Sequence, residues 1–198
     1  MKKYIESDGQ TNTPEFKKWF GKSKVVKGGK PLVVYHGTDK QFNAFDVKKQ
    51  GGNVDKSGKL GFFFSGKAKV ASDFGKKSTK DREYKVGANI IPVYLSIKNP
   101  KEIGVKGFTA FISDYSKYRR EAIKQGYDGV SIKPFSKEEE ENWISIFGKA
   151  NISEYKSLQY VAFFPNQIKS AIGNNGNFDS KSDNILESRK RYIRLFEV

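Results

Sequence analysis

The sequence has no cysteine and a single histidine, His36, among its 198 residues. Disulfide bonds and cysteine-ligated zinc are therefore excluded, and one histidine disfavours a histidine-built site, so we expect no metal. There is no run of about 18 apolar residues, and the opening MKKYIESDGQ lacks the apolar core of a signal peptide. These absences predict a soluble protein without a membrane partner, cytoplasmic in the producing or target cell.

Acidic residues are also scarce relative to basic ones. Lys and Arg number 37 against 22 Asp and Glu, which gives a formal charge of +15. Such an excess favours a polyanionic partner such as RNA or DNA, while a diffuse positive surface that serves solubility is the alternative. A hydrophobic content of 36% suits one domain with a sizeable core.

The stretch LVVYHGT, residues 32–38, contains the only histidine. Its β-branched apolar run predicts a central strand covered on both faces. At the strand exit, Gly37 lets the backbone approach a ligand closely, and His36 and Thr38 offer hydrogen-bonding groups. The alternative is a histidine satisfied in the core and a glycine that only turns the chain.

The elements before and after this strand have clear local signals. Residues 13–20 predict a helix with an N-cap threonine, and Gly21 is expected to end it. The glycine- and lysine-rich stretch 48–59 predicts a flexible surface loop. A strand over 60–65 and a helix over 67–75, which Gly75 is expected to end, follow.

The second half of the chain predicts further strands and helices. The apolar alternation at 89–100 indicates a strand, and its Pro92 favours an edge position or a bulge. Residues 137–142, KEEEEN, are typical of a solvated helix start, and 157–165 predict another strand. Gln167 is interpreted as structural.

One domain is expected over residues 1–179. Residues 180–198 are expected to form a polar linker followed by a basic helix or tail, because the stretch 185–198 has an amphipathic basic pattern. The sequence leaves open whether this tail packs on the domain, binds a polyanion or joins to something larger.

Several of these motifs together resemble the ADP-ribosyltransferase superfamily, on the histidine-tyrosine-glutamate side that includes poly(ADP-ribose) polymerases and diphtheria-toxin-like enzymes. The layout is most similar to the ADP-ribosyltransferase domains of phage and mobile-element polyvalent proteins. The shared features are the opening TPEFKKWFGKSKVVKGGKPLVVYHGT, the central GFFFS, an NP-ended strand, a YDG and the closing YVAFFPNQIKSAIGNNGNFD, spanning roughly residues 13–179. The resemblance implies an α+β fold with a split, twisted, mostly antiparallel sheet, flanking helices and an NAD cleft between the sheet halves.

The resemblance also implies roles for residues of the NAD+ site. His36 would hold the adenosine-side ribose, and the backbone of Gly37 would clasp the nicotinamide carboxamide beside Thr38. Phe63 and Phe74 fall on the two family aromatics, eleven residues apart. Two aromatic faces can sandwich a pyridinium ring, which is a physical reason for that spacing.

Two further positions bear on the same pocket. Ser65 would support the pocket. Ala71 stands where the family has a serine, so one expected hydrogen bond to the carboxamide has no donor side chain.

The largest departure from the family is Gln159, which stands at the position of the catalytic glutamate. A carboxylate there would bind the nicotinamide ribose 2′-hydroxyl and stabilise an oxocarbenium-like transition state, a role that a neutral amide fills poorly. Three explanations stay open: a natural variant with weak or substrate-assisted transfer, a deliberate isosteric substitution, or a protein that binds NAD+ or ADP-ribose without turnover. Glu154 could supply a carboxylate only if the strand were shifted or a loop folded over it.

The implied activity is mono-ADP-ribosyl transfer from NAD+ to a macromolecular acceptor, with no metal. High positive charge favours RNA or DNA as the acceptor, and a protein side chain is the other expectation. A non-catalytic NAD+ or nucleic-acid binding module and an NAD+ glycohydrolase toxin are the alternative functions.

Overall fold

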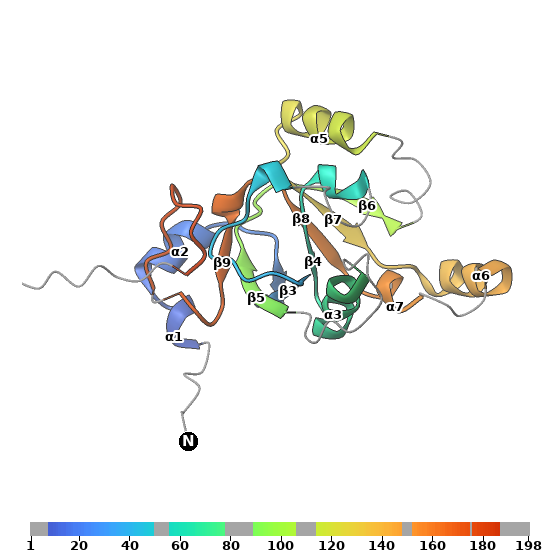
Figure 1. Ribbon diagram of the computed structural model, residues 1–198, viewed down its shortest axis with the longest axis horizontal. Coiled ribbons are helices and arrows are strands. Elements are labelled where there is room, and N and C mark those ends of the chain that lie inside the picture. Colours follow the sequence, from blue (N-terminus) through green and yellow to red (C-terminus); the bar gives the residue numbers. More distant parts are fainter. Residues whose placement is uncertain are drawn as a thin grey trace, which may run out of the picture.

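The computed structural model describes residues 8–49, 56–77, 89–105, 114–147, 152–174 and 176–186. Its centre is a seven-stranded sheet in the order β6-β7-β8-β4-β3-β5-β9, in which only β6 and β7 run parallel (Figure 1). These strands are β3 Val34–Thr38, β4 Phe62–Ser65, β5 Asn89–Leu95, β6 Pro100–Gly104, β7 Gly129–Lys133, β8 Gln159–Ala162 and β9 Ile168–Ser170. The mostly antiparallel sheet with separate helices is the expected α+β fold.

A two-stranded ribbon and a set of mostly short helices complete the described structure. The ribbon pairs β1 Val26–Lys27 with β2 Lys30–Pro31. The α-helices are α1 Asp8–Thr11, α2 Pro14–Phe20, α3 Ala68–Lys77, α5 Tyr115–Lys124, α6 Lys137–Phe147 and α7 Ile152–Tyr155. The 3₁₀ helices are η1 Val47–Lys49, η2 Lys56–Leu60 and η3 Pro165–Gln167.

The predicted N-terminal helix is confirmed as α2. The Thr13 side chain accepts a hydrogen bond from the Phe16 backbone N–H at 3.1 Å, and Gly21, at a φ of 52°, ends the helix. Phe16 and Trp19 are buried beneath it against Tyr94 of β5 and against Phe178. The aromatic face of this helix therefore packs against the sheet.

The sheet separates two hydrophobic clusters, because side chains of a strand alternate between its faces. On one face, Phe62 and Phe64 join Tyr160 and Ala162. On the other face, Val161 packs with residues of η2, β7 and α5, and Phe63 packs against this second cluster. The three consecutive phenylalanines of β4 thus pack into the clusters on both faces of the sheet.

The expectation that Pro92 marks an edge strand or a bulge is wrong, because β5 lies between β3 and β9 and pairs with β3 through Pro92 without an extra residue. Pairing with β9 covers only Val93–Leu95, so Pro92 lies just outside the paired stretch. The missing N–H of the proline therefore interrupts no bond to β9.

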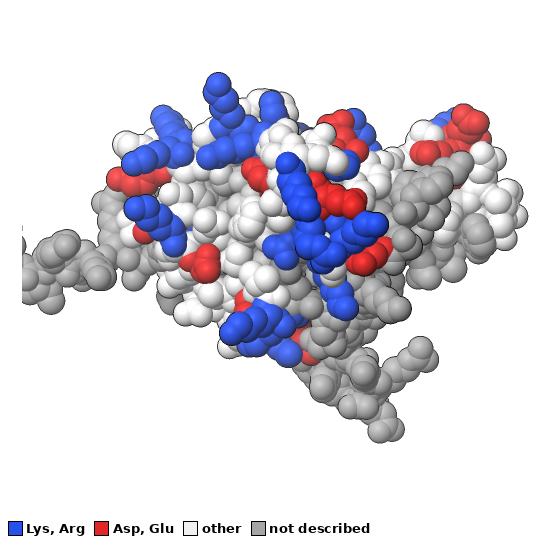
Figure 2. Space-filling view, turned by 90° about the horizontal axis from the view of Figure 1, so that it is seen from above, with Lys and Arg blue, Asp and Glu red and all other residues white. Residues whose placement is uncertain are grey.

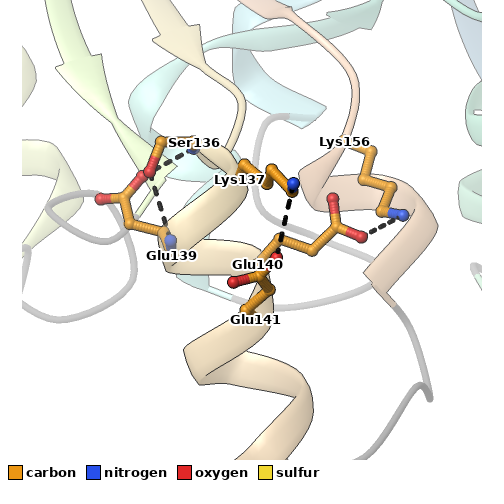
Figure 3. Close-up of polar contacts among 6 residues, drawn as sticks. All are labelled: Ser136, Lys137, Glu139, Glu140, Glu141 and Lys156. Atoms are coloured by element: carbon orange, nitrogen blue, oxygen red, sulfur yellow. Dashed lines mark hydrogen bonds and ion pairs between the residues drawn. The ribbon is translucent and has the colours of Figure 1, made fainter.

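The acidic run at 137–142 begins helix α6, as expected, and the contacts that fix it are drawn in Figure 3. Glu139 and Ser136 bond each other's backbone N–H groups, which is a capping box. Glu140 forms an ion pair with Lys156, and Glu141 lies 4.0 Å from Lys137. The carboxylates of this run are therefore partly neutralised by nearby lysines.

The segment expected to start a polar linker lies against the sheet in its described part. Ile185 is buried in the first cluster, its N–H donates to the Asn43 carbonyl, and Asn184 forms a β-bridge with Ala44. Residues 187–198, the expected basic helix or tail, lie outside the described residues, as do residues 50–55 of the expected loop.

Candidate active site

The predicted NAD+ residues come from three adjacent strands and one helix. Strands β3, β4 and β8 are consecutive in the sheet, but they are joined unequally. Four residue pairs join β4 to β8, whereas Tyr35 with Ser65 is the one pair that joins β3 to β4 within the described residues. Beyond this pair the ladder between β3 and β4 is interrupted, and we call this place the β3–β4 gap.

The backbone of Gly37 faces the β3–β4 gap. Pro92 lies opposite Tyr35 on β5 and has no N–H to donate, so this pair cannot exchange hydrogen bonds. Residues of an antiparallel strand direct their polar groups alternately to either neighbour, so Tyr35 and Gly37 direct theirs toward β4. The Gly37 N–H and C=O therefore lie where a planar amide could take the place of a missing strand partner.

The imidazole of His36 bridges the two strands at this gap. Its Nδ1 lies 2.9 Å from the Phe63 carbonyl oxygen, and because a carbonyl only accepts, Nδ1 carries the proton and donates. Burial lowers the pKa of His36, against the smaller opposing effect of the Phe63 bond. The ring is therefore held as the neutral tautomer with its lone pair on Nε2.

The other ring nitrogen of His36 is open to an external donor. Within the described part of the chain Nε2 has no hydrogen-bond partner, and it is not among the buried polar atoms that lack one. A neutral Nε2 accepts hydrogen bonds. It can therefore accept a hydroxyl of a bound ligand.

Phenylalanine rings surround the histidine. Phe42, Phe45 and Phe64 lie 6.3, 5.0 and 5.5 Å from the imidazole centroid. The segment around Phe42 and Phe45 was not predicted to contribute, although its FNAFD pattern lies only six residues beyond His36 and was the available signal. These rings fix the orientation of the imidazole and exclude water from one side of it.

Helix α3 packs directly on Gly37. A Cβ placed on Gly37 would lie 1.6 Å from the Ala71 carbonyl oxygen and 3.0 Å from the Gly75 backbone nitrogen. The expectation that Gly75 ends this helix is wrong, because α3 continues to Lys77. Gly75 is buried instead, and its lack of a side chain allows the helix and the strand to approach closely.

This packing also locates Phe74 and Ala71. Phe74 is half-buried and precedes Gly75, so its backbone lies near the strand end at Gly37. Ala71 is buried on the face of α3 toward Gly37, so the position of the missing family serine lies beside that strand end.

Gln159 lies in a row of side chains that crosses the sheet. Tyr35, Ser65, Gln159 and Ile132 are successive register partners on β3, β4, β8 and β7. Paired residues project to the same face, so Gln159 is on the side of the sheet covered by α3. His36 is one residue from Tyr35 and projects to the opposite face, while Gln159 itself is buried.

The hydroxyl of Ser65, which was predicted to support the pocket, bonds to two other segments of the chain. Ser65 Oγ lies 3.0 Å from Ser157 Oγ and accepts the Lys67 N–H at 3.1 Å. Together with the bond from the Gly66 N–H to the Leu158 carbonyl, this fastens the turn before α3 to the segment before Gln159. Ser157 was not predicted to contribute; it stood at the start of the strand expected over 157–165, whereas β8 begins at Gln159 and leaves Ser157 in the preceding loop.

Thr38 likewise forms a local turn rather than facing outward. Its Oγ1 accepts the Lys40 N–H at 3.2 Å, and the residue is buried. Thr38 thereby shapes the strand exit beside Gly37.

Gln167 is structural, as interpreted. Its Oε1 accepts from the Phe163 and Phe164 N–H groups, and its Nε2 donates to the Ser96 and Asp128 carbonyls. Glu154 belongs by sequence to α7, a helix separate from β8. No group of three or more metal-ligating side chains occurs among the residues that the structure describes.

Comparison with known proteins gives one family. The sequence profile described as ADP-ribosyltransferase in polyvalent proteins matches residues 27–178, which include β3, β4, α3 and β8. The chain has no significant match among curated proteins or among solved structures. No helix within the described ranges is long and apolar enough to cross a membrane.

Proposed function

Because this chain belongs to the family of ADP-ribosyltransferase domains found in polyvalent proteins, we propose that it moves a single ADP-ribose unit from NAD+ to a macromolecular acceptor. The observation that supports this most directly is the β3–β4 gap. It combines an open backbone donor and acceptor at Gly37 with an accessible imidazole nitrogen at His36.

In the proposed complex, the nicotinamide carboxamide pairs with the backbone N–H and C=O of Gly37, as a strand would. Phe63 and Phe74 contribute aromatic faces near the pyridinium ring, and stacking with cation–π attraction favours the cationic ring. His36 accepts a ribose hydroxyl of the adenosine half at Nε2. These three contacts hold the dinucleotide across the gap.

The chemical step breaks the bond between ribose C1′ and the nicotinamide nitrogen. The electron pair of that bond leaves with nicotinamide, which neutralises the pyridinium. A nucleophilic oxygen or nitrogen of the acceptor then bonds to C1′ and loses its proton. Positive charge develops on the ribose, so a carboxylate at position 159 would stabilise the transition state, and the neutral Gln159 stabilises it less.

The decisive test is the rate of nicotinamide release by this chain and by Gln159→Glu. We expect the substitution to raise the rate by about 100-fold, the usual scale for one electrostatic contact to a developing charge. Gln125→Glu is the matched control, because Gln125 is an exposed residue at the end of α5. That control should leave the rate unchanged.

The same assay separates the alternatives. Release of nicotinamide with free ADP-ribose as the sole product would indicate an NAD+ glycohydrolase. Saturable NAD+ binding by both proteins, without any release, would identify a binding module. If both proteins are inert and neither binds NAD+, the proposed function is wrong.

The acceptor class is the remaining part of the proposal. The charge of +15 supports RNA or DNA, and a protein side chain is the competing acceptor. Incubating Gln159→Glu and labelled NAD+ with RNA, DNA and cell lysate would show which class carries the label.

A further inference from the structure

Helix α5 carries a stripe of cations on its outward side. Lys117, Arg120 and Lys124 are spaced by three and four residues, so they share one face of the helix, and all three are exposed. No ion pair joins them to a carboxylate within the described residues. The lysines that flank the acidic helix α6 differ, because Lys137 and Lys156 both lie against glutamates (Figure 3).

Two carboxylates lie near the stripe and offset part of its charge without forming an ion pair with it among the described residues. Asp114 caps α5 by accepting the Lys117 N–H at 2.9 Å, and this bond is the main cause of the lowered pKa of Asp114. Lys117 and Arg120 contribute to that lowering more weakly. Glu121 is exposed on the same helix and forms no ion pair among the described residues.

Neighbouring elements add cations to the stripe. The Lys101 ammonium lies 5.0 Å and 5.4 Å from the ring centroids of Tyr118 and Tyr127, and Lys59 is exposed on η2, which contacts α5. Figure 2 looks onto the side of the molecule where α5 lies, and many blue side chains project from it, with red ones between them. We call Lys59, Lys101, Lys117, Arg120 and Lys124 the α5 surface.

The α5 surface is firmly attached to the strands of the candidate site. Ala122 is fully buried, and Tyr118 packs on the cluster that also contacts Phe63. Arg119 donates to the Phe163 carbonyl directly after β8 and lies over the Phe163 ring. Cations on the outer side of α5 are thus held in a fixed relation to Gln159 and Phe63.

We propose that the α5 surface binds the phosphate backbone of a nucleic acid. Lys117, Arg120 and Lys124, which are exposed and form no ion pair among the described residues, are suited to phosphates, and the counterions released on binding supply free energy. A membrane surface is disfavoured, because such helices also present a large apolar face, whereas Ile123 is the one large hydrophobic residue exposed on α5. Binding itself does not depend on the proposed function. The role of the bound strand as acceptor rests on the proposed function.

The test is binding of a fluorescent 30-nucleotide RNA, and of DNA of equal length, to the full chain without NAD+. The variant combines Lys117→Gln, Arg120→Gln and Lys124→Gln. We expect the slope of log affinity against log salt to fall by about 2, with an affinity loss of about 100-fold at 100 mM salt. Unfolding curves would verify that the variant is folded.

A matched variant removes the same charge elsewhere. Lys17→Gln, Lys18→Gln and Lys22→Gln change exposed lysines on and just after α2. Equal losses in both variants would mean that diffuse charge, not the α5 surface, causes binding, and would overturn the proposal. Unchanged RNA affinity of the α5 variant would also overturn the proposal. In a parallel assay with phosphatidylserine vesicles, a loss of vesicle binding without a loss of RNA binding would overturn it as well.

Because this binding is measured without NAD+, its outcome is independent of catalysis. A negative result leaves the proposed transfer reaction untouched. A Gln159→Glu protein that releases no nicotinamide would instead contradict the proposed transfer reaction, and the binding result would still hold.

Discussion

Strand β4 is bonded very differently along its two edges. Toward β8 it forms four register pairs, from Phe62 with Ala162 to Ser65 with Gln159. Toward β3 it has the single pair of Tyr35 with Ser65, and a histidine side chain takes the place of the next backbone bond.

The difference separates a structural edge from the edge that carries the proposed NAD+ site, which we call the binding edge. A continuous ladder satisfies every backbone group and leaves nothing for a ligand. An interrupted ladder leaves donors and acceptors exposed in a fixed geometry, and at the β3–β4 gap those groups belong to Gly37 and to the ring of His36.

Replacing Gly37 with alanine should disrupt the binding edge most severely. The new Cβ would lie 1.6 Å from the Ala71 carbonyl oxygen, so α3 would have to move away from β3. We expect a loss of about 3 kcal/mol or more in the free energy of unfolding, measured by urea denaturation.

Gly104→Ala on β6 is the matched control, because nothing lies within 4 Å of a Cβ at that position. Its free energy of unfolding should change by no more than about 0.5 kcal/mol. A similar loss in both variants would show that the closeness of α3 to Gly37 has no energetic importance.

Replacing His36 with phenylalanine should remove the bond between the strands while keeping an aromatic ring. We expect a loss of about 1.5 kcal/mol at pH 7.5. The lowered pKa of the folded histidine means that the unfolded chain binds the proton more readily, so the stability of the natural protein falls as the pH drops below about 6.5. The difference between the two proteins should therefore shrink on acidification.

Because His36 is the only histidine, no other imidazole contributes in this pH range. Urea denaturation at pH 5.5 to 7.5 would measure the difference, and ¹⁵N NMR of the single ring would identify the protonated nitrogen. A proton on Nε2 rather than Nδ1 at neutral pH would contradict the bond to Phe63.

The hydroxyl pair of Ser65 and Ser157 should give the smallest effect. A double-mutant cycle with Ser65→Ala and Ser157→Ala should yield a coupling of about 0.5 to 1 kcal/mol, because the two groups share one bond at 3.0 Å. Ser145→Ala on α6 offers an exposed hydroxyl as the control partner. A coupling of Ser65 to Ser145 equal to that with Ser157 would contradict a direct contact.

Local signals in the sequence were read correctly where one residue type has one structural consequence. Thr13 and Gly21 delimit α2 as expected. The same kind of reasoning was wrong for Gly75 and Pro92. A glycine can end a helix or allow close packing, and a proline can mark an edge or lie just outside a paired stretch.

Residue types and short spacings were enough to predict the strand that carries His36, the helix with Phe74, the excess of positive charge and the family likeness. The separation of β3 and β4 after one pair, the direction of the Gly37 backbone toward the gap and the bond between Ser157 and Ser65 became visible in the folded chain alone. These features depend on contacts between residues far apart in the chain. The free energy of such contacts comes from packing and register, which no short stretch of sequence specifies.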